Sequence, residues 1–115
     1  MISGIGTDIV EIERVKKVIS DGFMAKVLSS DELERTKEMS ETRKIQFLAG
    51  RFAAKEAIIK CLSDRELPNM SDLNITNDEK GKPEIRYKDY EILLSISHER
   101  NYATAVAVLC DKEVF

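Results

Sequence analysis

Isoleucines spaced among small residues open the chain, and this pattern predicts a β-strand over residues 2–9. Apolar residues at helical spacing then predict a short helix over residues 11–19. Asp21-Gly22 is expected to break that helix, with a further helical turn over residues 23–27. Ser29, with Glu32 three residues later, is typical of a capping box, and the helix that it begins is expected to end near residue 39.

The longest apolar stripe lies in the middle of the chain and predicts a helix from Ser40-Glu41 to about residue 62. Its members are Ile45, Leu48, Phe52, Ile59 and Leu62. After a polar loop over residues 63–72, two hairpins are predicted, 73–77 with 84–87 and 91–98 with 102–110. In the last strand small alanines occupy alternate positions, so one face is expected to pack closely: Ala103, Ala105 and Ala107. Helices followed by paired strands predict an α+β fold with an antiparallel sheet.

Composition limits the functional classes. The 115 residues suit one domain, 1–115, and 43% hydrophobic with 34% charged residues indicate a folded chain. A net charge of −3 counts against general nucleic-acid binding. Two distant cysteines and one histidine exclude a zinc cluster of the usual spacing and predict free thiols in a reducing cytoplasm. We expect neither a signal peptide nor a membrane span.

The GIGTD segment raises the first question of chemistry. It is not a dinucleotide fingerprint, because Ile9 stands where GxGxxG needs its third glycine, and it lacks the setting of a phosphate loop. Gly4 and Gly6 would let another backbone or a ligand approach the strand closely. From its position alone, Asp8 is as consistent with a helix cap as with a metal ligand.

A second acid, Glu56, follows Phe52 by four residues and therefore lies on or beside the apolar stripe. An ionised carboxylate there needs a paired cation, because its desolvation alone is costly. The alternative is a solvated i,i+4 pair with Lys60. Arg51, Lys55 and Lys60 on the same helix could neutralise phosphates, or they could simply be solvated.

The only histidine, His98, ends a predicted strand in the segment SISH. It could be structural, or it could pair with Ser95 or Ser97, although no nucleophile elbow is present. The DEKGKP turn is expected to use Gly81 for a positive φ and to expose Lys82.

Taken together, these segments resemble one family. IGTDIVEIERV, FLAGRFAAKEAIIK, GKP and SISHERNYATAVAV occur in order over nearly the whole chain. They are similar to the holo-acyl-carrier-protein synthases, the small type of 4′-phosphopantetheinyl transferase. The combination is specific, whereas any one segment alone would not be.

The resemblance implies an Mg²⁺-dependent enzyme of fatty acid biosynthesis. It would transfer 4′-phosphopantetheine from coenzyme A to a serine of apo-acyl carrier protein and leave adenosine 3′,5′-bisphosphate. It also implies the 4′-phosphopantetheinyl transferase fold with one long central helix, assembled as a cytoplasmic homotrimer with interfacial sites. Asp8 and Glu56 would hold the metal, which suits the preference of Mg²⁺ for carboxylates together with substrate phosphate.

Further roles follow from the same resemblance. Lys60, Arg43 and Arg51 would contact phosphates of the coenzyme. Gly81, Lys82 and Pro83 would lie along its nucleotide end, and Ser97 and His98 would bind phosphate at a neighbouring subunit's site. Glu34 would be the general base acting through water, with Asp31 and Glu32 as substitutes. A basic first helix would bind the carrier protein through Arg14, Lys16 and Lys17, with Met24 and Lys26 beside it. The alternatives are a coenzyme A-binding module without transfer and a structural oligomerisation domain.

Overall fold

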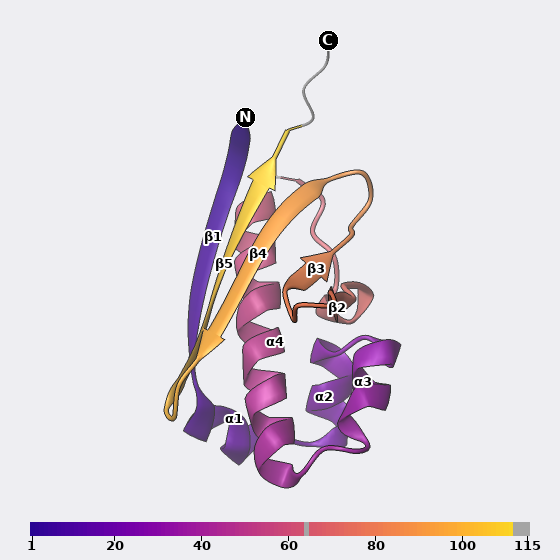
Figure 1. The fold of residues 1–115 in the computed structure, drawn as a ribbon, viewed down its shortest axis with the longest axis vertical. Coiled ribbons are helices and arrows are strands. Elements are labelled where there is room, and N and C mark those ends of the chain that lie inside the picture. Colours follow the sequence, from indigo (N-terminus) through magenta and orange to yellow (C-terminus); the bar gives the residue numbers. More distant parts are fainter. Residues whose placement is uncertain (64, 112–115) are drawn as a thin grey trace.

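In the computed structural model, a twisted antiparallel sheet packs against the long side of one helix (Figure 1). The structure describes residues 1–63 and 65–111. The elements run in the order β1 (Ile2–Glu11), α1 (Ile12–Val18), α2 (Asp21–Val27), α3 (Ser30–Thr36), α4 (Glu41–Leu62), the 3₁₀ turn η1 (Met70–Asp72), β2 (Ile75–Asn77), β3 (Pro83–Ile85), β4 (Glu91–His98) and β5 (Tyr102–Cys110). The predicted α+β class with antiparallel strands is confirmed.

The main sheet has the strand order β1-β5-β4, so the first strand of the chain lies beside the last. Asp8 is paired with Ala105, and Ser97 with Thr104. Strands β2 and β3 form a separate two-stranded sheet. Both predicted hairpins are therefore present, and β4 and β5 have the predicted bounds.

Close packing of β1 against α4 explains the two N-terminal glycines. A Cβ atom at Gly6 would lie 2.0 Å from the carbonyl oxygen of Ala57, and one at Gly4 would lie 2.1 Å from that of Cys61. Any side chain there would force the strand and helix apart. The predicted close approach of another backbone is therefore confirmed: it is that of the chain's own helix, and no ligand is needed to explain the glycines.

Asp8 lies on the same face of β1 as Gly4 and Gly6, the face toward α4, because residues two apart in a strand point to the same side. Gly6 and Val10 are buried on this face, and Asp8 between them is partly buried. The predicted alanine face of β5 also lies against α4, with Ala103, Ala105 and Ala107 buried. Small side chains on both strands thus let the helix and sheet come close enough for their polar groups to meet.

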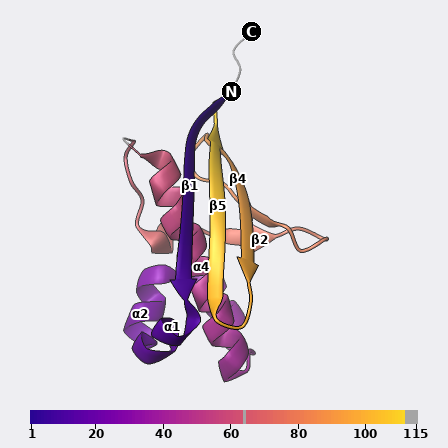
Figure 2. The same cartoon turned by 90° about the vertical axis from the view of Figure 1, so that its left-hand side faces the viewer.

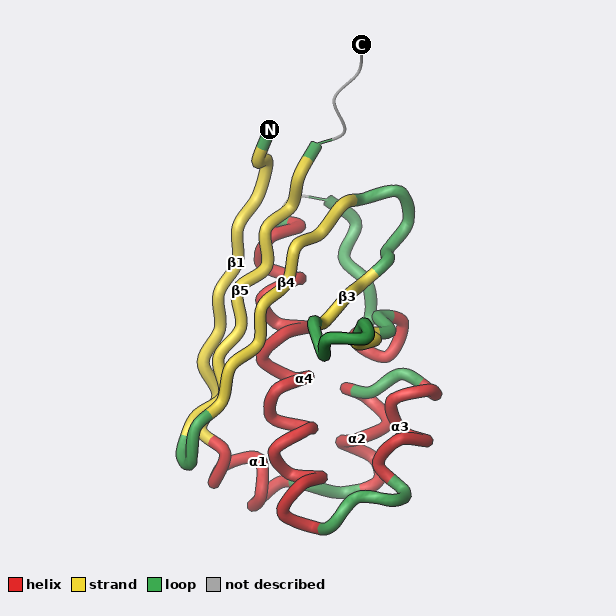
Figure 3. The backbone as a smooth tube through the Cα atoms, viewed as in Figure 1, coloured by secondary structure: helices red, strands yellow, loops and turns green. Residues whose placement is uncertain are grey.

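Helix α4 is buried on most of its circumference, because the sheet covers one side while α2 and α3 lie on the other (Figures 1 and 3). The predicted stripe is real but understates this burial, since Ala49, Ala53 and Ala57 are fully buried as well. Two charged residues, Arg51 and Lys55, are also buried in the helix. Their partners are described with the site below.

Three local predictions require correction. Asp21-Gly22 does not break a helix but lies in the first turn of α2, where the Ser20 hydroxyl accepts a hydrogen bond from the Phe23 N–H at 3.0 Å. Helix α3 ends at Thr36 and not near residue 39. The loop predicted over residues 63–72 contains η1. The capping box of Ser29 and Glu32 is confirmed.

The outer face of the main sheet is uncovered by any described element. Figure 2 shows the three strands in front with the helices behind them. Large apolar side chains project from all three strands, with Ile5 69% and Ile9 64% exposed, and Leu93 and Val106 exposed beside them. No described helix is both long enough and apolar enough to span a bilayer.

Candidate active site

Asp8 and Glu56 line one cavity of about 420 Å³, at the contact between β1 and α4. Asp8 is far from capping a helix: it lies within β1, which continues to Glu11, and the helix-cap alternative is wrong. Glu56 is half-buried on α4. The walls are mainly apolar and include Val10, Phe23 and Phe52. Two carboxylates from distant parts of the sequence thus face the same space, and a third, Glu11, also lines it but pairs with Arg14.

Lys60 binds the strand and not its helical neighbour. Its ammonium Nζ lies 3.1 Å from Asp8 Oδ1 and donates to the Thr7 carbonyl oxygen at 2.9 Å. Among the described residues no hydrogen bond or ion pair involves Glu56, so the alternative Glu56–Lys60 surface pair does not form. The ammonium group fixes the Asp8 carboxylate beside Glu56, an acid with no polar partner among the residues that the structure describes.

This donor set fits Mg²⁺ when the substrate completes the shell. Asp8 and Glu56 offer carboxylate oxygens, and no group of three or more Asp, Glu, His or Cys residues capable of holding a metal occurs in the described part of the chain. Mg²⁺ is commonly held by one or two carboxylates plus water and phosphate oxygens. The cavity therefore suits an ion that arrives with a phosphorylated ligand better than a resident structural metal.

A second cavity, of about 440 Å³, is lined by basic side chains. Five of the predicted coenzyme-binding residues meet here, namely Arg43, Arg51, Gly81, Pro83 and His98. Arg35, Gln46, Phe47, Gly50, Asn77 and Ile96 complete the lining. No described lining residue is an Asp or Glu. Lys82 and Ser97 are exposed and do not line it. The cavity is suited to an anion.

Among the described residues, the two cavities have no lining residue in common. His98 and the Gly81 turn belong to the basic cavity, whereas Asp8 and Glu56 belong to the other. Among the described residues no hydrogen bond joins His98 to a serine, which gives no support to a Ser–His pair. Within one chain, the Asp8–Glu56 pair and the basic groups around His98 therefore line two separate cavities.

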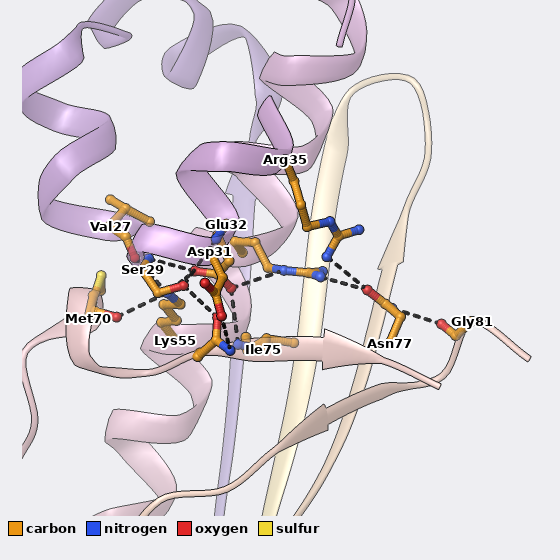
Figure 4. Close-up of polar contacts among 12 residues, drawn as sticks. Val27, Ser29, Asp31, Glu32, Arg35, Lys55, Met70, Ile75, Asn77 and Gly81 are labelled. Carbon is orange, nitrogen blue, oxygen red and sulfur yellow. Dashed lines mark hydrogen bonds and ion pairs between the residues drawn. The ribbon is translucent and has the colours of Figure 1, made fainter. Parts of the chain in front are cut away.

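Arg51 is held firmly at the wall of the basic cavity. Its Nε lies 3.3 Å from Glu32 Oε2, and its Nη2 donates to Asn77 Oδ1 at 2.8 Å (Figure 4). Burial lowers the pKa of Arg51 to about 10; the Glu32 carboxylate opposes that shift, while the nearby Arg35 and Arg43 charges add to it. The guanidinium is thus oriented by the protein and surrounded by excess positive charge.

Lys55 binds the same Glu32 carboxylate as Arg51 and lines neither of these two cavities. It is fully buried, and its ammonium donates to the Val27 carbonyl at 2.7 Å, the Met70 carbonyl at 3.0 Å and the Glu32 carboxylate (Figure 4). Burial lowers the pKa of Lys55, and the bond to Glu32 opposes that shift. The second oxygen of Glu32 accepts from the Ile75 N–H at 3.2 Å. One buried carboxylate therefore ties α3 and α4 to β2.

None of the three candidates for a general base lines the cavity of Asp8 and Glu56. Glu32 cannot serve, because it is buried and bound to Lys55 and Arg51. Glu34 is exposed on α3, pairs with Lys37 at 2.8 Å, and lines neither of these cavities. Asp31 is also exposed and accepts from the Asn74 amide at 3.3 Å. The structure does not bring Glu34 to the Asp8–Glu56 pair within one chain.

The predicted basic surface on the first helix is only partly as expected. Arg14, Lys16 and Lys17 are exposed on α1, and Arg14 also lines the cavity of Asp8 and Glu56. Met24, in contrast, is buried in the core and cannot face a partner, whereas Lys26 is exposed. Arg14 thus joins the exposed basic surface of α1 to the carboxylate cavity, and carrier-protein binding by this surface stays a prediction.

Sequence reasoning missed the site roles of Arg35, Asn77 and Lys55. Arg51 and Lys55 stand four residues apart in the segment GRFAAKEA, whose other positions are mostly small or apolar. That context could have indicated two buried cations needing one shared acid. Asn77 carries no comparable signal, because the two arginines that it contacts are distant in sequence.

Comparison with known proteins places this arrangement among related chains. A model of the 4′-phosphopantetheinyl transferase superfamily matches residues 4–107. A holo-[acyl-carrier-protein] synthase of Geobacillus sp. (strain WCH70) is 43% identical, covering 95% of this chain and 97% of its own. The corresponding synthase of Staphylococcus carnosus (strain TM300) is 42% identical, with the same coverage.

Solved structures agree with the sequence matches. A holo-(acyl-carrier-protein) synthase from Bacillus anthracis str. Ames, in complex with CoA (3′,5′-ADP), superposes with a TM-score of 0.88 at 38% identity, covering 95% of this chain and 96% of its own. A Helicobacter pylori holo-[acyl-carrier-protein] synthase in complex with coenzyme A gives 0.78 at 31% identity, covering 92% and 99%.

Proposed function

This chain belongs to the 4′-phosphopantetheinyl transferase superfamily, and we propose that it carries out the reaction of a holo-acyl-carrier-protein synthase. It transfers 4′-phosphopantetheine from coenzyme A to a serine of apo-acyl carrier protein and releases adenosine 3′,5′-bisphosphate. Residues 1–115 act as one transferase domain, in the cytoplasm and in fatty acid biosynthesis. The observation that carries the proposal is the pair of carboxylates, Asp8 and Glu56, facing one cavity from β1 and α4.

Asp8 and Glu56 would hold Mg²⁺, which would offset negative charge on the pyrophosphate of coenzyme A when bound. Lys60 has two tasks in this assignment. Its bond to Asp8 fixes the carboxylate, and its exposed ammonium is placed to contact a phosphate oxygen. Such fixed charges stabilise the negative charge that builds up on the leaving phosphate, because no side chain has to reorganise as the reaction proceeds.

The basic cavity would hold the nucleotide end of the coenzyme. Arg43, Arg51 and His98 supply donors to phosphate, while Gly81 and Pro83 form the wall beside them. Lys82 and Ser97 lie at its margin, next in sequence to lining residues, and are proposed to reach the ligand from there. The absence of acids from the described lining supports the assignment, since a carboxylate would repel the phosphates.

The remaining partners are assigned to the surface. Glu34 is proposed to accept the proton of the carrier serine through water, because its carboxylate is exposed to solvent. Arg14, Lys16 and Lys17 are proposed to guide the carrier protein, which is acidic, to the carboxylate cavity. Arg14 supports this role best, because it is exposed and also lines that cavity.

We further propose a homotrimer in which each active site combines two half-sites from neighbouring copies. The separation of the two cavities within one chain and the exposed apolar face of the sheet both favour such an assembly. Glu56→Gln and His98→Ala would each inactivate one half-site. Co-refolding the two variants should restore up to about a quarter of native turnover, because chance assembly pairs an intact carboxylate half with an intact basic half that often. Mixtures no more active than the separate variants would contradict composite sites.

The reaction itself is tested by chromatography of the nucleotide product. Protein, coenzyme A, Mg²⁺ and apo-carrier protein should release adenosine 3′,5′-bisphosphate in proportion to the carrier added. Chelation by EDTA should stop the release, and added Mg²⁺ should restore it. Coenzyme A binding without any release would instead support the binding-module alternative.

A further inference from the structure

We propose that Arg35 is an additional substrate-binding residue, which contacts a phosphate at the nucleotide end of the coenzyme. This inference rests on the proposed function and extends it to a residue on α3. Arg35 lines the same basic cavity as Arg43, Arg51 and His98. It would make the phosphate site a cluster of three guanidinium groups.

The Arg35 side chain is exposed but not free. Its guanidinium lies over the Phe47 ring at 4.9 Å from the centroid, and its Nη1 donates to Asn77 Oδ1 at 3.3 Å (Figure 4). Arg51 contacts the same ring, at 4.6 Å, and the same amide oxygen. The exposed Arg35 therefore shares both the aromatic ring and the amide oxygen with the buried Arg51, which is unlike a freely solvated surface arginine. The two guanidinium groups are thus held as neighbours.

Only one of these neighbours has a carboxylate partner within the described residues. Arg51 has Glu32, whereas the contacts of Arg35 are an aromatic ring and a neutral amide. The positive charge of Arg35 already acts on Arg51, whose protonated form it disfavours. A bound dianion would remove this repulsion and accept charge-assisted hydrogen bonds from both groups. The positive charge of Arg35 has no counter-charge among the described residues, and a bound phosphate would supply one.

Asn77 connects this pair to the turn that forms the opposite wall. Its Nδ2 donates to the Gly81 carbonyl at 2.9 Å, and Asp78 steadies the same turn by accepting from the Lys80 and Lys82 N–H groups. One amide therefore sets the distance between the two arginines and the turn that lines the cavity. A ligand phosphate seated there would be in reach of Arg35 without rearrangement of the backbone.

The test is calorimetric titration of the purified protein with coenzyme A and, separately, with adenosine 3′,5′-bisphosphate. Arg35→Gln should weaken both ligands about tenfold, which is the range of one charge-assisted hydrogen bond to phosphate. Arg35→Lys keeps the positive charge but loses the planar guanidinium. Its affinity for both ligands should lie between that of the unchanged protein and that of Arg35→Gln. The matched control is Arg86→Gln, which removes the same charge from an exposed position outside the cavity and should bind like the unchanged protein.

Each outcome is decisive. Equal affinity in Arg35→Gln and Arg86→Gln would overturn the inference while leaving the proposed function intact. A loss seen with coenzyme A but not with the bisphosphate would also overturn it, because the contact would then lie outside the nucleotide end. Failure of the unchanged protein to bind either ligand would overturn the proposed function, and this inference with it.

Discussion

Replacing Glu56 with glutamine is expected to lower kcat/KM for phosphopantetheine transfer by about a thousandfold, because it removes one of two carboxylates proposed to hold the metal. The amide keeps the size of the side chain but loses its charge. Glu56 has no ion pair among the described residues, so the fold loses no partner. The thermal midpoint should stay unchanged or rise slightly, because an uncompensated half-buried charge is gone.

Steady-state turnover and thermal unfolding of the same sample check this prediction. Glu41→Gln is the matched control, since it makes the same change at the exposed start of the same helix. It should retain near-native turnover. If Glu56→Gln also kept near-native turnover, Glu56 would not be a metal ligand, and the proposed role of the Asp8–Glu56 pair would be wrong.

The second large effect is expected on the free energy of unfolding, when the buried carboxylate of Glu32 is removed. Glu32→Gln should lower the free energy of unfolding by about 3–5 kcal/mol, because Lys55 and Arg51 then remain buried without a counter-charge. The measurement is urea unfolding at a fixed protein concentration, monitored by circular dichroism. The double variant Glu32→Gln/Lys55→Met should recover part of the loss, since one orphaned charge is removed as well.

Helix α3 provides a matched control for this experiment. Glu34→Gln makes the same change two residues away, in an exposed pair with Lys37. Surface pairs contribute little, so its cost should be below about 1 kcal/mol. Equal losses in Glu32→Gln and Glu34→Gln would show that the buried cluster does not support the wall of the basic cavity in the way described.

The elements of this fold were largely predictable because their signals are local. Alternating alanines defined β5, the DEKGKP turn joined β2 to β3, and a serine began each of α3 and α4. The misreading of Asp21-Gly22 has a physical cause: Ser20 caps α2 directly before it, and a first helical turn tolerates Asp and Gly. Local rules do not tell whether such residues end one helix or begin the next.

The candidate site was predictable only in part. Asp8 and Glu56 could be singled out as acids in apolar surroundings, but only the packing of α4 against Gly4 and Gly6 shows that they share a cavity. A pair of Lys60 with Glu56 was one alternative from the sequence, yet Lys60 binds an acid and a carbonyl oxygen of β1. Competition between a helical neighbour and a distant strand cannot be judged from spacing.

The contacts around the buried Glu32 show most clearly what the sequence could not predict. Lys55 looked like one more basic residue on a helix, and Glu32 like a cap. Their bond joins residues 23 positions apart, and the Arg35–Asn77 contact joins residues 42 apart. Contacts of this kind arise from the way the layers stack, which no short pattern in the sequence records.

Intact-mass spectrometry of the carrier protein tests the central claim most directly. After incubation of this protein with coenzyme A, Mg²⁺ and apo-carrier protein, the carrier should gain one phosphopantetheine group on its serine, and Glu56→Gln should abolish that gain. An unchanged carrier mass, under conditions in which a known transferase modifies the same sample, would contradict the account.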